Sequence, residues 1–290
     1  MTTCVYPAKV LLFGEYTLFQ GSGALVQPYT RYTASWQRGE GVHDELLAFL
    51  DFLAEAEIGR QLNLARLRHD IVQGTYLQSS IPYGYGLGSS GAFCAAIVDT
   101  YGTDALRSAD LPAQKKALAE LESYFHGASS GIDPLVCLRG EPLWLDPDGQ
   151  LTPVSLPTLQ AYQLFLVDTG QARQTEPLVR FFKESWEQTE FRERAVAQWV
   201  TPTRNAIDAY RTGDEAALWE AFTAISTYQL TALPPMVIPP VQEVWRAGLA
   251  GTDYRLKICG AGGGGFMLGI APKSTKIAQL VPGFTTIKLN

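Results

Sequence analysis

The chain has 290 residues, of which 46% are hydrophobic and 18% charged, and this balance excludes an intrinsically disordered chain. The 23 Lys and Arg residues against 29 Asp and Glu residues give a net charge of -6, so the sequence lacks the basic field that binds extended nucleic acid. No run approaches the ~20 apolar residues of a transmembrane helix, and the N-terminus lacks the apolar core of a signal peptide. We therefore expect a cytoplasmic, globular protein of about two domains that binds neither nucleic acid nor a membrane.

The first half of the chain alternates between strand-like and helix-like patterns. Residues 44–57 carry a broad apolar stripe with helical spacing, which predicts a helix lying on a sheet. The other segments predicted here are strands at residues 10–13, 29–36 and 71–77 and helices at residues 92–101 and 113–125. The four cysteines, which are Cys4, Cys94, Cys137 and Cys259, are far apart and form no CxxC pair, so we expect buried, reduced thiols.

A proline-rich segment at residues 140–157 predicts a boundary between domains at 1–157 and 158–290. Beyond it the patterns predict a strand at 162–167, a long helical stretch at 175–200 and two shorter helices reaching residue 228. A helix at 240–250, strands at 255–259 and 266–270, a short helix and a last strand at 285–289 follow. The second half is thus expected to be an α+β unit.

Two glycine tracts suggest contact with a ligand. The first, Gly86-Leu87-Gly88-Ser89-Ser90-Gly91, opens a predicted helix, where backbone N–H groups and the helix dipole favour phosphate oxygens. It lacks the preceding apolar strand of a dinucleotide site and the Gly-Lys pair of a P-loop, and an ordinary turn with a serine N-cap stays open. The second tract, residues 260–265, joins two predicted strands and has five glycines in six positions, which indicates a close approach to the backbone.

Four ionisable side chains are candidates for chemistry. Glu122 lies four residues before His126 on one predicted helix, so both share a helix face, and Asp133 follows in the loop or at the next helix start. One carboxylate would suit Mg²⁺ and the other a general base. Lys9 lies in an apolar strand and needs an anionic partner. The alternatives are a solvated glutamate, an N-cap aspartate, a core histidine and an edge-strand lysine.

Taken in order, the segments PAKVLLFGEY, PYGYGLGSSGA and KICGAGGGGF resemble the three motifs of the GHMP kinase superfamily. The pattern E-x-x-x-H-G-x-x-S-G-I-D from Glu122 to Asp133 and the segment LVDTGQARQT are similar to the mevalonate kinase branch. The resemblance implies an α+β fold of two domains, the first like domain 2 of ribosomal protein S5 and the second ferredoxin-like. It implies an ATP-dependent kinase that acts on an alcohol, with mevalonate as the acceptor, and a homodimer.

The resemblance also implies roles for individual residues. Asp133 would accept the proton of the acceptor hydroxyl, with Lys9 stabilising that carboxylate or the transferring phosphoryl group. Ser90 and Glu122 would hold Mg²⁺. The residues expected to cradle the phosphates of ATP are Gly84, Tyr85, Gly86, Leu87, Gly88, Ser89 and Ser90. The residues expected at the acceptor are Tyr16, Arg173, Thr175, Gly262 and Gly263.

Two departures from the family pattern concern the acceptor and the phosphate loop. Tyr16 stands where mevalonate kinases typically have histidine, and Gly91 stands where alanine is usual. The alternatives are therefore a GHMP kinase for a sugar or for phosphomevalonate, and a catalytically silent GHMP-like ligand sensor. A diphosphomevalonate decarboxylase fits the Glu122 to Asp133 pattern less well.

Overall fold

A computed structural model describes residues 4–289, apart from the side chain of His126. The chain forms two compact units that interleave along the sequence. The first unit contains the described residues up to Val10, then Gln27–Pro82 and Leu87–Glu141. The second contains Leu11–Val26, Tyr83–Gly86 and the chain from Pro142 onward. The predicted division between residues 157 and 158 stays a prediction.

The first unit is mainly helical. Its helices are α1 (Asp44–Glu55), the 3₁₀ helix η2 (Glu57–Gln61), α2 (Leu64–Val72), α3 (Ser89–Tyr101), α4 (Asp104–Arg107), α5 (Leu111–His126) and α6 (Ile132–Arg139). The strand β3 (Thr75–Ser79) pairs antiparallel with the end of β2 (Ala24–Arg38), and β1 (Val5–Phe13) is the other neighbour of β2 in this unit. Both β1 and β2 also contribute residues to the second unit.

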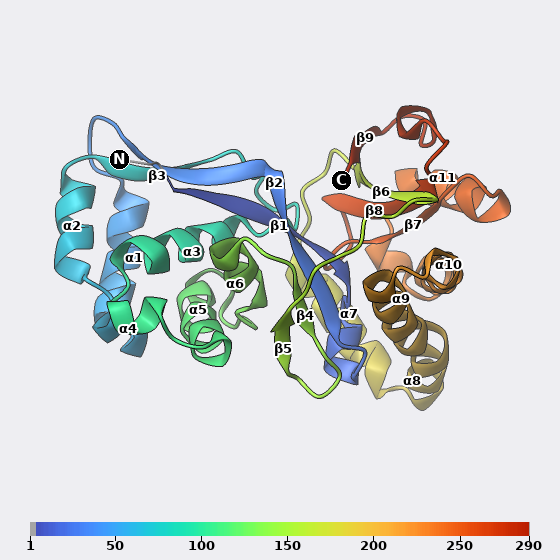
Figure 1. The fold of residues 1–290 in the computed structure, drawn as a ribbon, viewed down its shortest axis with the longest axis horizontal. Coiled ribbons are helices and arrows are strands. Elements are labelled where there is room, and N and C mark those ends of the chain that lie inside the picture. The colour runs from blue at the N-terminus through green and yellow to red at the C-terminus, as the bar shows by residue number, and fades with distance from the viewer. Residues whose placement is uncertain (1–3, 290) are drawn as a thin grey trace. The chain divides into compact units, whose positions relative to one another are not determined.

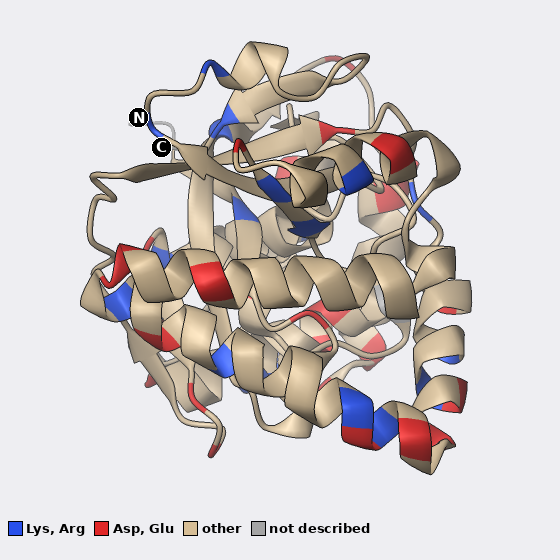
Figure 2. Ribbon diagram, turned by 90° about the vertical axis from the view of Figure 1, so that its right-hand side faces the viewer, with Lys and Arg blue, Asp and Glu red and all other residues tan. Residues whose placement is uncertain are grey.

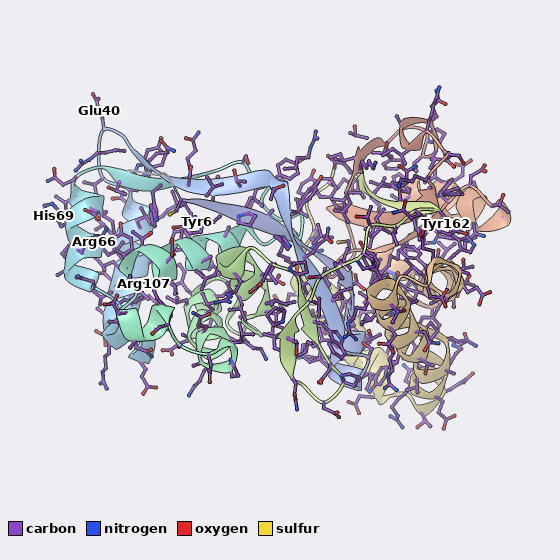
Figure 3. The ribbon with its side chains drawn as sticks, in the orientation of Figure 1. Tyr6, Glu40, Arg66, His69, Arg107 and Tyr162 are labelled. Carbon is purple, nitrogen blue, oxygen red and sulfur yellow. The ribbon has the colours of Figure 1, made fainter. Side chains whose placement is uncertain are left out.

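Helix α3 is the centre of the first unit, because most of its own residues are small or apolar and are buried. Ala92, Cys94 and Ala96 have no exposed surface, and the helix packs against both α5 and α6 (Figure 1). Its C-terminal end is held by polar side chains that Figure 3 labels. The hydroxyl of Tyr6 donates to Asp99 at 2.8 Å, and the guanidinium of Arg107 donates to the carbonyl of Gly102 at 2.6 Å. A guanidinium at a helix C-terminus satisfies carbonyls that have no partner within the helix, so α3 is firmly placed.

The second unit contains a four-stranded antiparallel sheet in the order β7-β8-β6-β9. These strands are β6 (Tyr162–Asp168), β7 (Arg255–Ile258), β8 (Phe266–Pro272) and β9 (Thr285–Lys288). The start of β2 pairs with β4 (Leu143–Leu145), which pairs in turn with β5 (Leu151–Pro153). The segment between β7 and β8 is the second glycine tract, as predicted.

Helices make up the rest of the second unit. They are α7 (Thr175–Glu187), α8 (Thr189–Ala195), the π-helix η3 (Val196–Val200), α9 (Thr201–Thr212), α10 (Glu215–Ala232) and α11 (Pro239–Ala250), with 3₁₀ turns at Thr17–Gln20, Pro234–Met236 and Ile277–Gln279. Helices α10 and α11 pack against β7, and the buried indole of Trp245 donates to Ser226 at 2.8 Å. Figure 2 shows acidic and basic positions interspersed along the helices on this side.

Most predicted elements are present, and four details were wrong. Helix α1 packs mainly on α2, η2 and α5 rather than on a sheet. Ile71 belongs to α2, where it lies four residues after Leu67 on the buried face, and the strand starts only at Thr75. The stretch at residues 175–200 is interrupted at Gln188, whose backbone is extended, and α10 is longer than the helices before it. Cys4 is exposed, while the other three cysteines are buried and all four are free thiols.

Candidate active site

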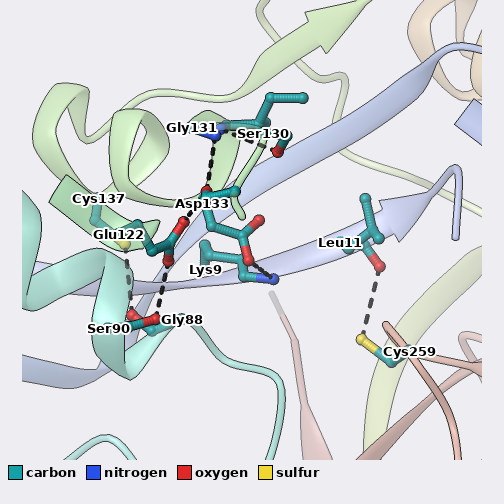
Figure 4. Close-up of polar contacts among 12 residues, drawn as sticks. Lys9, Leu11, Gly88, Ser90, Glu122, Ser130, Gly131, Asp133, Cys137 and Cys259 are labelled. Carbon is teal, nitrogen blue, oxygen red and sulfur yellow. Dashed lines mark hydrogen bonds and ion pairs between the residues drawn. The ribbon is translucent and has the colours of Figure 1, made fainter. Parts of the chain in front are cut away.

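In the first unit, Lys9 and Asp133 form an ion pair, with Lys9 Nζ 2.6 Å from Asp133 Oδ2 (Figure 4). Lys9 comes from β1, and Asp133 is the second residue of α6, as predicted for the start of a helix. Only 4% of the Lys9 side chain is exposed, whereas Asp133 keeps 37% of its side chain exposed. The buried cation thus has its anionic partner, and the carboxylate remains accessible to a second group. The alternative of a strand lysine that reaches out to water is wrong.

Gly88, in the first glycine tract, allows the Lys9 side chain to pack closely against the backbone. A Cβ atom at Gly88 would sit 2.9 Å from Lys9 Cγ, and Gly88 has a φ of 76°. The backbone N–H of Lys9 donates to the carbonyl of Leu87 at 2.9 Å. Leu87 and Gly88 therefore fix the position of Lys9 by a backbone hydrogen bond and by close packing.

Glu122 lies beside the ion pair and accepts hydrogen bonds from two serines. Ser90 Oγ donates to Glu122 Oε1 at 2.9 Å, and Ser129 Oγ donates to Oε2 at 2.5 Å. Burial raises the pKa of Glu122, the negative charge of Asp133 raises it further, and the two serine hydrogen bonds oppose the shift. Only 5% of Glu122 is exposed, so the predicted alternative of a solvated helix charge is wrong. A buried carboxylate whose pKa is raised by burial and by a neighbouring negative charge is typical of a functional site.

Ser129 was missed by the sequence analysis. Its hydroxyl donates to Glu122 and accepts from the backbone N–H of Gly131 at 3.0 Å, so it ties the carboxylate to the turn that starts α6. A serine seven residues after a helical glutamate carries no spacing signal, because the chain turns at Gly127 between them.

The start of α3 has the character predicted for an anion-binding helix end. Its N-cap is Gly88, and no side chain caps the helix, so the alternative of a serine N-cap is wrong. Ser90 instead points to Glu122, and Ser89 is half-buried. The first-turn N–H groups of a helix without a side-chain cap favour a negatively charged ligand.

In the second unit, the loop at residues 260–265 is crossed closely by other segments of the same unit. A Cβ atom at Gly262 would lie 2.8 Å from the Met236 carbonyl oxygen, and one at Gly265 would lie 2.7 Å from the Tyr85 carbonyl oxygen. Both glycines have a positive φ, of 75° and 70°. The predicted close approach to this tract is thus made, at these two positions, by the chain's own backbone.

The predicted acceptor residues of the second unit have different surroundings. Arg173 donates from Nη1 to the carbonyl of Cys259 at 2.9 Å, and its backbone N–H donates to Gly84 at 3.2 Å. Thr175 is exposed at the start of α7. Gly263 donates its N–H to the Met236 carbonyl at 2.7 Å. Tyr16 is buried, and its hydroxyl donates to the carbonyl of Ala261 at 2.8 Å.

A buried ion pair between Glu15 and Lys257 is the second feature that the sequence analysis missed. Their side chains are 1% and 0% exposed and in direct contact, and Lys257 Nζ also donates to the carbonyl of Ile258 at 2.8 Å. Burial raises the pKa of Glu15, and the adjacent ammonium group opposes that shift. The signal in the sequence was a lysine within one apolar strand and a glutamate just after another, but nothing in their spacing linked them.

Three further predicted residues take ordinary structural positions. Leu87 is buried in the first unit, and the ring of Tyr85 packs edge-on against Phe266 at 5.4 Å in the second. Gly86 leaves room for the guanidinium of Arg173, since a Cβ atom there would lie 2.5 Å from Nη2. The side chain of His126, predicted to share a face with Glu122, lies outside the described part of the structure.

The site fits a metal ion that takes few ligands from the protein and most from bound phosphates and waters. Among the side chains that the structure describes, which leave out that of His126, no three His, Cys, Asp or Glu side chains gather as a ready metal centre. Glu122 and Ser90 nevertheless place a carboxylate and a hydroxyl oxygen 2.9 Å apart, and Mg²⁺ usually takes one or two protein carboxylates together with phosphates and waters.

Of the described helices, none is long and apolar enough to cross a membrane.

Residues 49–141 match the family described as GHMP kinases N terminal domain. The chain is 27% identical to mevalonate kinase of Archaeoglobus fulgidus, covering 94% of this chain and 95% of that protein.

Two solved structures share the fold. The Lin0012 protein from Listeria innocua superimposes with a TM-score of 0.71 at 17% identity, over 99% of this chain and 97% of that one. The L. major mevalonate kinase in complex with R-mevalonate gives 0.65 at 15% identity, over 100% of this chain and 97% of that one. These likenesses confirm the predicted α+β fold. Residues 49–141 thus match the GHMP kinase N-terminal domain, and the chain as a whole is similar to the mevalonate kinases.

Proposed function

We propose that this protein is an ATP-dependent kinase that transfers the γ-phosphoryl group of ATP to the hydroxyl of mevalonate, giving 5-phosphomevalonate and ADP. The observation that carries the proposal is the cluster in the first unit. It consists of the partly exposed Asp133 carboxylate paired with the buried Lys9, the buried Glu122 carboxylate, and the start of α3, which no side chain caps. The similarity to mevalonate kinases over nearly the whole chain selects the acceptor.

In this proposal Asp133 accepts the proton of the acceptor hydroxyl while the hydroxyl oxygen bonds to the γ-phosphorus and the bond to ADP breaks. Lys9 holds Asp133 Oδ2 and leaves the remainder of the carboxylate accessible. Phosphoryl transfer depends mainly on positioning and on stabilising negative charge, and a general base adds typically about 10²–10⁴-fold.

The ATP phosphates would lie along Gly84 to Ser90, and the N–H groups at the start of α3 would receive phosphate oxygens. Ser90 and Glu122 would hold Mg²⁺, which neutralises phosphate charge when bound. The negative charge of Asp133, which lies close enough to raise the pKa of Glu122, favours a bound cation at this position. We assign Tyr16, Arg173, Thr175, Gly262 and Gly263 to the acceptor side on the sequence resemblance alone, and a homodimer on the same basis.

The deciding experiment is a coupled assay of ADP release with Mg-ATP, run in parallel with mevalonate, phosphomevalonate and a panel of hexoses. Turnover with mevalonate and with none of the other acceptors, with the product identified by phosphorus NMR, supports the proposal. Preference for another acceptor would retain the kinase and replace its substrate. Tight ATP binding without turnover on any acceptor would identify a ligand sensor instead.

A further inference from the structure

The backbone between β7 and the second glycine tract is fixed by three side chains that each bind a carbonyl. Lys257 Nζ donates to Ile258, Arg173 Nη1 to Cys259 and Tyr16 Oη to Ala261, at 2.8, 2.9 and 2.8 Å. All of these residues belong to the second unit. Three polar contacts on four consecutive residues are more than a hairpin connection between two strands requires.

Tyr16 has the clearest signs of a special role among the three. Among residues 4–289 it is the one non-glycine residue with a positive φ, at 59°. A bulky side chain at positive φ costs free energy, and such strain persists only where the surrounding structure requires it. Here the Tyr16 ring packs on Phe182 with ring centroids 4.7 Å apart, and 8% of the residue is exposed.

The residue before Tyr16 contacts the same loop. Glu15 binds the ammonium group of Lys257, and its carboxylate also accepts the backbone N–H of Gly260. Two consecutive residues, Glu15 and Tyr16, therefore fix Gly260 and Ala261. Burial raises the pKa of Tyr16, so its hydroxyl stays protonated and can keep donating.

We infer that Tyr16 is a positioning residue, which holds the glycine loop through its hydroxyl, and that it makes no direct polar contact with the acceptor. The hydroxyl is already committed to Ala261 from a buried position, and its ring is fixed by Phe182. The loop that it positions carries Gly262 and Gly263. The catalytic consequence rests on the proposed function, whereas the effect on the loop does not.

The test uses Tyr16→Phe, which removes the hydroxyl and keeps the ring. Tyr254→Phe is a matched control, because Tyr254 is also buried in the second unit and its hydroxyl also donates to a backbone carbonyl, that of Val244 at 2.5 Å. Hydrogen–deuterium exchange of the peptides covering residues 258–265 is measured on the ligand-free protein. Losing one hydrogen bond should speed exchange there about threefold to tenfold in Tyr16→Phe, with no change in Tyr254→Phe.

Steady-state kinetics with the acceptor that the coupled assay identifies then distinguish positioning of the loop by Tyr16 from direct contact with the acceptor. Positioning predicts faster loop exchange together with a rise of about threefold to tenfold in KM for the acceptor, and unchanged kinetics in Tyr254→Phe. A raised KM with unchanged loop exchange would mean that the hydroxyl contacts the acceptor directly, which overturns the inference. Unchanged exchange with unchanged KM would overturn it as well. Should the protein prove to have another acceptor or no turnover, the exchange measurement still decides whether Tyr16 holds the loop.

Discussion

The two lysines that lie in strands, Lys9 in the first unit and Lys257 in the second, are both buried and both paired, but with different kinds of carboxylate. Asp133, the partner of Lys9, has 37% of its side chain exposed, whereas Glu15, the partner of Lys257, has 1%. The first pair therefore leaves part of its carboxylate side chain accessible from outside. The second has no access to water, and its remaining contacts are with the backbone of a glycine loop.

The exposure of the carboxylate therefore decides whether such a pair can take part in chemistry or can only support the structure. A carboxylate that a ligand can reach can exchange a proton with it, while one that is fully buried between a lysine and a backbone N–H group can only hold its neighbours. Removing a partner should therefore affect turnover at Asp133 and folding at Lys257.

Asp133→Asn should lower turnover by about 10²–10⁴-fold, because an amide cannot accept the proton of the acceptor hydroxyl. Affinity for ATP should change little, since the phosphate loop and Glu122 are untouched. Steady-state kinetics and calorimetric titration with ATP measure the two effects. A variant with near wild-type turnover would show that Asp133 is not the base.

Lys257→Met should lower the free energy of unfolding by about 3–5 kcal/mol, because it leaves the Glu15 carboxylate buried without a cation. Lys9→Met should cost less, because the half-exposed Asp133 can be hydrated, although this variant should lose turnover. Chemical denaturation of both variants, with Glu15→Gln combined with Lys257→Met as the control, measures the difference. The double variant should recover part of the loss, and equal costs for the two single variants would mean that exposure of the carboxylate does not set the cost.

Gly91→Ala should lower stability by about 1–3 kcal/mol through overpacking, and turnover should fall several-fold. The added Cβ atom would lie 3.0 Å from the backbone nitrogen of Pro134 and 3.1 Å from the carbonyl carbon of Asp133. Helices α3 and α6 would have to separate, which moves Asp133 relative to Ser90. Thermal unfolding and kcat are measured together. Unchanged values for both would mean that the two helices adjust freely.

Glu122→Gln should stabilise the protein by about 0.5–2 kcal/mol at neutral pH while weakening Mg²⁺-dependent activity. Burial and Asp133 raise the pKa of Glu122 in the folded state, so the folded state binds a proton more readily than the unfolded chain does. The wild-type protein therefore loses stability as the pH rises through the folded pKa, and the glutamine variant lacks this loss. The gain should shrink below the ordinary glutamate pKa of about 4.3. Denaturation curves from pH 4 to pH 8 decide it, and a variant less stable at pH 7 would be the opposite result.

Local patterns in the sequence predicted much of the fold and part of the site. The small apolar residues at 92–101 predicted a buried helix, and α3 is one. Lys9 within an apolar strand predicted an anionic partner, and that partner is Asp133. Ser129 and the Glu15–Lys257 pair were missed because their partners depend on turns and on residues far apart in the chain, which no spacing rule reveals.

The sequence by itself determined the order of helices and strands, the position of the glycine tracts and the resemblance of three motifs to one superfamily, because these depend on local composition and periodicity. Only the tertiary structure decided which carboxylate is accessible, which is buried, and what each glycine allows to come close. It also placed the Tyr16 hydroxyl on the carbonyl of Ala261, at the glycine loop. Burial and charge pairing depend on contacts between distant segments, so the same residue types have different roles in the two units.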